Sequence, residues 1–189
     1  MKIIIWFVLV IVFLTTAVVS VSGQSEFKEY KSKFIEFQYP VEWESAMKEG
    51  LNEYGSYVDK DKRISFDIPN TKEGAFTVFI LDSNKKNLDE LLQEEIGYYR
   101  DAEMESLLEI KNKILEITDI NLSNEPAKKI IVYEEALNKK FDDKKILQIC
   151  SLHDNKRYSI LYRMNSASFD NHIPTIEKII QLVTFPKTE

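Results

Sequence analysis

The sequence predicts an α+β domain, in which a β-sheet packs against a small number of helices. Residues 34–39 nearly alternate aromatic and β-branched side chains with polar ones, as a half-buried strand does, and Pro40 ends the row. Residues 75–81 form a more apolar strand, which suits the middle of a sheet. Between residues 88 and 102, apolar side chains recur at steps of three and four residues, which predicts an amphipathic helix.

Composition and charge restrict the class of protein. The chain has 189 residues, of which 44% are hydrophobic and 30% charged, with only five glycines and five prolines. These values are typical of one globular domain with its own core, and not of a disordered or repetitive chain. The net charge of −6 argues against nucleic-acid binding, which requires a basic face opposite the phosphates.

The N-terminus carries an almost uninterrupted apolar run over residues 3–21, directly after Lys2. A run of this length lies between the apolar core of a signal peptide and a membrane-spanning helix. We therefore expect an N-terminal apolar helix within residues 1–23, which is either a cleaved signal peptide or a membrane anchor. The predicted location of the domain is extracytoplasmic, either secreted or held in the cell envelope by residues 3–21.

After this leader, polar residues 24–32 predict a linker or a short first strand ahead of a domain over residues 33–186. The charged stretch 44–54 allows one turn of helix. Residues 56–58 and 63–68 predict a hairpin, because the second segment alternates apolar and polar side chains.

The clearest helix begins after Asn87, or after Ser83 upstream, either of which can act as N-cap. Asp89 and Glu90 in the first turn favour this start, because the helix dipole attracts negative charge there. The apolar stripe consists of Leu88, Leu91, Leu92, Ile96, Tyr99 and Ala102. The opposite face is expected to be solvated and consists of Glu94, Glu95, Arg100 and Glu103.

Two further hairpins are predicted, from strands at 114–122 and 129–134 and from strands at 145–152 and 157–164. The first of these strands alternates imperfectly, which predicts a β-bulge. A last helix is expected to be entered at Pro174 and to precede the end of the fold. Its candidate caps are Ser168, Asp170 and Asn171.

Three segments of the chain carry a family pattern: a strand that ends in Tyr39-Pro40-x-x-Trp43, a turn with Pro-Ala at residues 122–130, and residues 169–185. The last segment has a Phe, an aliphatic-Pro pair, and a helical stretch before Val-Thr-Phe. Together they resemble the PsbP-like family, named for an extrinsic subunit of photosystem II. The chain departs from the family at Glu125, where a Gly is often found.

The resemblance covers residues 30–185 and implies an antiparallel sheet with helices packed on both sides, an α/β/α sandwich. Members of the family are commonly exported and act as non-catalytic assembly or stabilising factors on membrane complexes. We therefore expect an exported or membrane-tethered binding domain without enzymatic activity or cofactor, which acts on a protein partner in an envelope complex. The photosystem role itself is not carried over.

Two alternative functions remain open at this point. One is a carrier that holds a lipid or other apolar ligand between sheet and helix, because the strands are rich in Phe, Ile and Leu. The other is a metal-dependent hydrolase with His153-Asp154 and Asp170-x-His172 as zinc ligands. Both pairs also suit a turn and a helix cap, which is the stronger interpretation. Cys150 lies in an apolar row and is expected to be a buried thiol rather than a nucleophile.

Aromatic residues supply the interface candidates. More of them occur than one apolar stripe requires, and Tyr is favoured at interfaces. The candidates for contact with the partner are Tyr30, Tyr54 and Tyr57. The alternative is that they cover the edges of the core.

Overall fold

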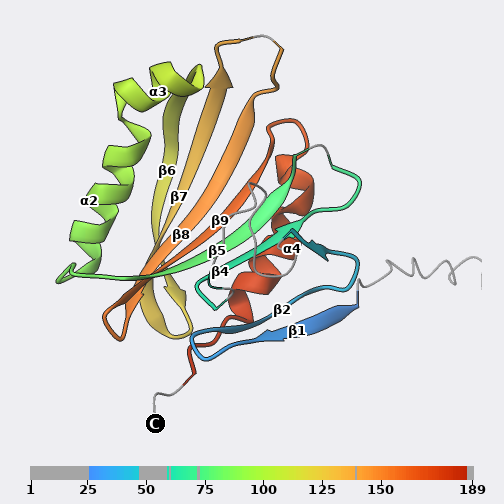
Figure 1. The fold of residues 1–189 in the computed structure, drawn as a ribbon, viewed down its shortest axis with the longest axis vertical. Coiled ribbons are helices and arrows are strands. Elements are labelled where there is room, and N and C mark those ends of the chain that lie inside the picture. Colours follow the sequence, from blue (N-terminus) through green and yellow to red (C-terminus); the bar gives the residue numbers. More distant parts are fainter. Residues whose placement is uncertain (1–25, 47–58, 60, 72, 139, 187–189) are drawn as a thin grey trace, which may run out of the picture.

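The structure is a computed structural model that describes residues 26–46, 59, 61–71, 73–138 and 140–186. It confirms the α+β class and the antiparallel sheet, which has seven strands in the order β3-β4-β5-β9-β8-β7-β6 (Figure 1). These strands are β3 (Glu44–Ser45), β4 (Arg63–Asp67), β5 (Ala75–Asp82), β6 (Ile110–Leu122), β7 (Glu125–Ala136), β8 (Lys144–His153) and β9 (Lys156–Asn165).

A separate two-stranded sheet consists of β1 (Phe27–Lys31) and β2 (Glu36–Pro40), which pair antiparallel. Of the two alternatives for residues 24–32, the structure therefore shows the short strand. The stretch 44–54 begins as strand β3 rather than as a helical turn, and its remainder lies outside the described residues. The predicted N-terminal helix and residues 56–58 also lie outside them. Among the described residues, none of the helices is long and apolar enough to cross a membrane.

Helices cover both faces of the sheet, as expected. Helix α2 (Leu88–Tyr99) packs on one face against β7 and β8, and helix α4 (Phe169–Gln181) packs on the other face, together with β2 (Figure 1). We call these the α2 face and the α4 face. Because side chains alternate along each strand, β8 sends Ile146, Gln148 and Cys150 to the α2 face.

The α4 face holds the larger core, which is built from aromatic rings. Phe76 is fully buried, with its ring centroid 6.0 Å from that of Phe37 and 5.7 Å from that of Trp43. The hydroxyl of Tyr162 donates to the carbonyl of Phe169 over 2.9 Å, so its polar atom is satisfied inside the core. The stretch around Pro40 thus supplies the centre of this core, in agreement with its alternating pattern.

The prediction that the last helix is entered at Pro174 was wrong. Helix α4 begins at Phe169, and Pro174 lies inside it. Burial of Phe169, which stacks on Tyr162 at 4.9 Å, offsets the hydrogen bond that proline removes. Of the predicted caps, Ser168 holds the N-cap position without a side-chain bond, and Asp170 lies in the first turn.

Helix α2 is also shorter than predicted. Asn87 caps it, accepting from the backbone N–H of Glu90 over 2.9 Å, but the helix ends at Tyr99. The backbone N–H of Arg100 bonds back to the carbonyls of Ile96 and Gly97, and the chain turns. The apolar stripe therefore excludes Ala102, which begins helix α3 (Ala102–Leu108).

Strand β6 forms one edge of the large sheet and carries the predicted bulge, where the register with β7 shifts between Ile114 and Glu116. Two-residue turns join β6 to β7 and β8 to β9. Ser123, Asn124, Asp154 and Asn155 all have positive φ in these turns, the conformation that matches the twist of a hairpin. After α4, Thr184 forms an isolated antiparallel bridge with Glu36 of β2.

Candidate functional site

The four zinc-ligand candidates form two pairs that lie near opposite ends of strand β8. His153 ends the strand, and its ring nitrogens lie 3.4 Å from carboxylate oxygens of Glu125 and Asp154. Asp170 instead binds Lys145 over 3.2 Å at the start of β8. Eight residues of strand span about 26 Å, so these groups cannot share one ion. His172 lies beside Asp170 in helix α4. The described residues contain no group of three or more His, Cys, Asp or Glu that could hold a metal.

The interface candidates have different positions. Tyr30 lies on β1, half-buried, and stacks on Phe37 at 5.1 Å, so it covers an edge of the α4-face core. Burial raises the pKa of its hydroxyl, with a further contribution from Asp61. Tyr54 and Tyr57 lie outside the described residues.

Cys150 is fully buried on the α2 face, as expected for a strand thiol. Burial raises the pKa of the thiol to about 12, and the nearby carboxylate of Glu95 acts in the same direction. The thiol therefore stays protonated at neutral pH and is a poor nucleophile.

A network of polar side chains runs under α2, centred on Gln148, which is 2% exposed. The hydroxyl of Tyr99 donates to Gln148 Oε1 over 2.6 Å. Gln148 Nε2 donates to Glu95 Oε2 over 2.8 Å and to Ser159 Oγ over 2.9 Å. Burial raises the pKa of Tyr99 far above its usual range, so this phenol remains a donor.

The acidic side of α2 is therefore not simply solvated, which corrects the expectation from the sequence. Glu95 binds Gln148, and Glu94 Oε1 accepts from Arg157 Nη1 over 2.6 Å. Glu94 also binds Lys85, which holds the pKa of its carboxyl below the usual range. The helix is amphipathic, but part of its charged side is used to attach it to β8 and β9.

A groove of about 360 Å³ lies between α2 and strands β5, β8 and β9; we call it the helix–sheet groove. Its walls are mainly apolar, from Phe79, Tyr98 and Leu161, and its floor is polar, from Gln148 and Ser159. Tyr98 is 56% exposed and lies at the open side. The groove thus combines apolar contact area with a few fixed hydrogen-bonding groups, as small-molecule sites do.

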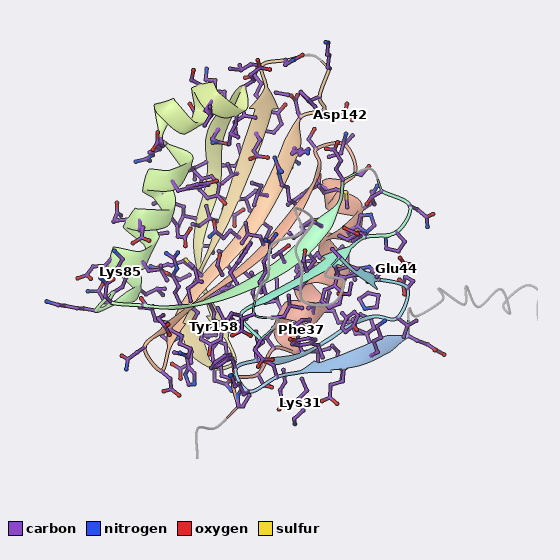
Figure 2. All side chains as sticks on the ribbon, viewed as in Figure 1. Lys31, Phe37, Glu44, Lys85, Asp142 and Tyr158 are labelled. Carbon is purple, nitrogen blue, oxygen red and sulfur yellow. The ribbon has the colours of Figure 1, made fainter. Side chains whose placement is uncertain are left out.

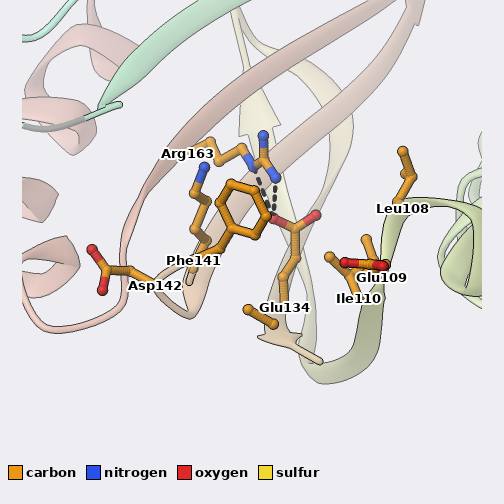
Figure 3. Close-up of a pocket in the computed structure, with 9 residues that line it drawn as sticks. Leu108, Glu109, Ile110, Glu134, Phe141, Asp142 and Arg163 are labelled. Atoms are coloured by element: carbon orange, nitrogen blue, oxygen red, sulfur yellow. Dashed lines mark hydrogen bonds and ion pairs between the residues drawn. The ribbon is translucent and has the colours of Figure 1, made fainter. Parts of the chain in front are cut away.

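A second hollow, the end pocket, lies where β7 and β9 reach helix α3 and has a volume of about 170 Å³ (Figure 3). Its walls include Leu108, Ile110 and Phe141. At its base lies Glu134, which is only 7% exposed. Arg163 binds Glu134 Oε2 through Nε at 2.8 Å and through Nη2 at 2.7 Å.

Exposed apolar side chains occur at the end pocket and next to it in the chain, and we call them the apical patch: Leu108 and Phe141 line the pocket, and Leu107 and Leu137 are adjacent in sequence to the lining residues Leu108 and Ala136. Their exposed fractions are 74% for Leu107, 51% for Leu108, 55% for Leu137 and 61% for Phe141. Figure 2 places the neighbouring Asp142 at the end of the sheet opposite Lys85, which precedes α2. Exposed large apolar side chains near one another are typical of surfaces that contact other molecules.

The sequence did not identify these residues as functional. Glu134 and Arg163 lie on strands that β8 separates, so only the strand order brings them together. Phe141 stands among charged residues at 139–145. This isolated Phe in a charged loop is the one feature of the sequence that could have indicated an exposed apolar site at the end pocket. Chemically, the arrangement holds a buried carboxylate beside apolar walls, which suits binding of a hydrogen-bond donor.

The arrangement of sheet and helices defines the chain as having the Mog1/PsbP-like fold. CyanoP, the cyanobacterial PsbP of Synechocystis sp. PCC 6803, superposes with a TM-score of 0.63 at 11% identity, over 88% of this chain and 96% of that one. The Ran-binding protein Mog1p of Saccharomyces cerevisiae gives 0.54 at 12% identity, over 84% and 95%. LpqN, involved in cell envelope biogenesis of Mycobacterium tuberculosis, gives 0.51 at 9% identity, over 86% and 91%.

No family model matches the sequence, and no curated protein matches it either. The resemblance to the PsbP-like family is therefore confirmed in the structural likeness to CyanoP, at the level of the fold. Identities of 9–12% do not carry a function from one protein to another.

Proposed function

We propose that this protein is an exported or membrane-tethered, non-catalytic binding domain that serves as an accessory or assembly factor for an envelope protein complex. It docks on its protein partner through the apical patch. The observation that carries this proposal is the exposure of four large apolar side chains at or next to the end pocket. Leu108 and Phe141 line it, Leu107 and Leu137 neighbour lining residues in the chain, and each of the four is more than half exposed.

The energetics of the patch support protein binding. Full burial of a Leu or Phe side chain contributes about 1.5–3 kcal/mol, so a partner that covers the patch gains a large share of the free energy of a specific complex. An apolar centre with a charged surround is the usual anatomy of such an interface. The fold adds a weaker argument by analogy, because one protein that shares it is described as Ran-binding and another as acting in envelope biogenesis.

Site-specific photo-crosslinking in intact cells tests the proposal. A photoreactive amino acid replaces Phe141 in the full chain, and a matched variant carries it at Gln38, an exposed position on β2. We expect Phe141 to give a discrete crosslink to a membrane protein complex and Gln38 to give none. Equal labelling from both positions, or no product from Phe141 at good labelling yield, would contradict docking through the patch.

The helix–sheet groove favours a second candidate function, carriage of an apolar ligand. Its volume of about 360 Å³ falls in the range of small-molecule sites, roughly 300–1,000 Å³. Native mass spectrometry of the full chain should then show a bound mass that is lost in Leu161→Trp, which fills the groove. Leu115→Trp, on the exposed edge strand, is the control and should retain it. Detection of the bare chain alone removes this candidate.

A further inference from the structure

We propose that the end pocket receives a basic side chain of the protein partner, whose cationic group bonds to Glu134 Oε1. This inference rests on the proposed docking through the apical patch and names the chemistry that the partner must present. It is carried by the geometry of the Glu134 carboxylate, by the charges around it and by the size of the pocket.

Only one of the two oxygens of the Glu134 carboxylate accepts hydrogen bonds from the residues that the structure describes. Both contacts from Arg163 go to Oε2, and within the described part of the chain Oε1 has no hydrogen-bond partner. Figure 3 shows this second oxygen on the side of Leu108 and Ile110, away from Arg163. Glu134 is only 7% exposed and lines the pocket, so the oxygen is reached from the pocket. The oxygen is therefore an accessible acceptor at the base of the pocket, and a charged donor from a ligand can take the place of water there.

A second acceptor lies beside the first. Asn112 faces Glu134 directly in the register of β6 and β7, so both side chains leave the same face of the sheet at adjacent positions. Its Oδ1 atom is buried and also has no hydrogen-bond partner among the described residues. Asn112 does not line the pocket, however, so Glu134 Oε1 is the acceptor that a ligand in the pocket meets, and ammonium and guanidinium groups both supply N–H donors to it.

The charges of the lining favour a cation. The pocket contains three carboxylates, from Glu109, Glu134 and Asp142, and two cations, Lys144 and Arg163. Each cation is already bound to a carboxylate, Arg163 to Glu134 and Lys144 to Glu73 outside the pocket. An incoming positive charge therefore meets an excess of negative charge.

The size of the pocket points to one side chain rather than a free metabolite. A volume of about 170 Å³ is below the roughly 300–1,000 Å³ of small-molecule sites. Leu108, Ile110 and Phe141 form apolar walls that suit the aliphatic stem of Lys or Arg, and the Phe141 ring can also attract the cation. A buried anchor within a ring of apolar contacts is the arrangement of an interface hot spot.

The test uses n-butylammonium, which reproduces the lysine side chain, and butyrate as the anionic control of similar size. The ¹⁵N-labelled full chain is titrated with each compound, and the backbone amide shifts are followed by NMR. We expect millimolar binding of n-butylammonium with shifts grouped at Ile110, Ala136 and Phe141, and weaker shifts with butyrate. Equal or stronger shifts with butyrate, or no shifts in the pocket, would overturn the inference.

Two variants test whether the Glu134 carboxylate itself is responsible for the binding of n-butylammonium. Glu134→Gln keeps an oxygen for Arg163 and replaces Oε1 with an NH₂ group, so n-butylammonium should bind at least about tenfold more weakly, as expected for loss of a charge-assisted bond. Glu135→Gln changes the net charge equally on the opposite face and should leave binding unchanged. If Glu134→Gln unfolds the chain, Ala136→Leu, which fills the pocket without altering the carboxylate, should abolish binding.

The same variants distinguish failure of this inference from failure of the proposed function. In cells, Glu134→Gln should reduce the crosslink from position 141 about tenfold relative to Glu135→Gln. A crosslink that persists undiminished would refute the basic side chain and leave docking intact. Absence of the crosslink from Phe141 in the otherwise unchanged chain would refute docking itself.

Discussion

The two faces of the sheet differ in how they are filled. The α4 face is packed with aromatic rings: the ring centroid of Phe37 lies 6.2 Å from that of Phe66 and 6.0 Å from that of Phe76. The α2 face has a smaller apolar cluster beside a buried amide, a buried carboxylate and two hollows. The α4 face thus contributes mainly apolar packing, whereas the α2 face also holds buried polar groups. The buried polar groups and the hollows thus lie on the face with the smaller apolar cluster.

The largest expected effect is on the α4 face. Phe76→Ala should lower the free energy of unfolding by about 3–5 kcal/mol, because it leaves a cavity among rings that cannot close around it. Phe141→Ala, at a position 61% exposed, should change it by less than about 0.5 kcal/mol. Urea unfolding of both variants measures the difference. Similar losses for the two would contradict the division between the faces.

The next effect concerns the polar network of the α2 face. Gln148→Leu keeps the volume but leaves Tyr99, Glu95 and Ser159 without their common partner, so it should destabilise the fold by about 1–3 kcal/mol. The double variant with Tyr99→Phe should recover part of this loss, because one orphaned donor is removed. Additive losses in this cycle would show that the two residues do not interact.

A smaller effect is expected at alkaline pH. The pKa of Cys150 rises from its ordinary value of 9.0 to about 12 in the folded protein. The stabilisation that comes from burying the protonated thiol is therefore fully present below about pH 9 and is lost as the pH rises toward about 12. Between these two pH values the unfolded chain releases the thiol proton and the folded chain does not. The loss is about 1 kcal/mol at about pH 10. Cys150→Ala should show a smaller fall in unfolding free energy between about pH 8 and about pH 10 than the unchanged chain. Identical falls would mean that the thiol is accessible to solvent.

The smallest effect belongs to the outer contacts of α2. Lys85 and Arg157 lower the pKa of Glu94, so the stabilisation that it contributes is present above about pH 4.5 and is lost as the pH falls through the folded pKa. Because the side chain is 42% exposed, Glu94→Gln should cost less than about 0.5 kcal/mol at neutral pH. Salt at about 1 M should remove this difference. A larger cost that resists salt would mean that α2 is attached mainly through its charges.

The sequence predicted most of the fold because its signals are local. Alternation located β2 and β4, an apolar run located β5, and the hairpin pattern located β8 and β9. Three- to four-residue periodicity located α2, capped by Asn87 as expected. The start of α4 was wrong because burial of Phe169 is a tertiary effect that outweighs the preference of Pro174 for a helix start. The candidate site was not predictable. Glu134 and Arg163 are 29 residues apart, and their pairing depends on the order of β7, β8 and β9 in the sheet.

The bulge in β6 has a consequence for how the protein behaves at high concentration. This edge strand has thirteen residues and exposes Leu115 and Ile117 at 48% and 42%, so a straight form of it would offer a template for another chain. The shift between Ile114 and Glu116 interrupts that template, and a bulge of this kind bends and twists the strand, which disfavours edge-to-edge pairing with another chain. We expect this one surplus residue to protect the molecule against self-assembly, so deletion of Leu115 should make the domain more prone to aggregate.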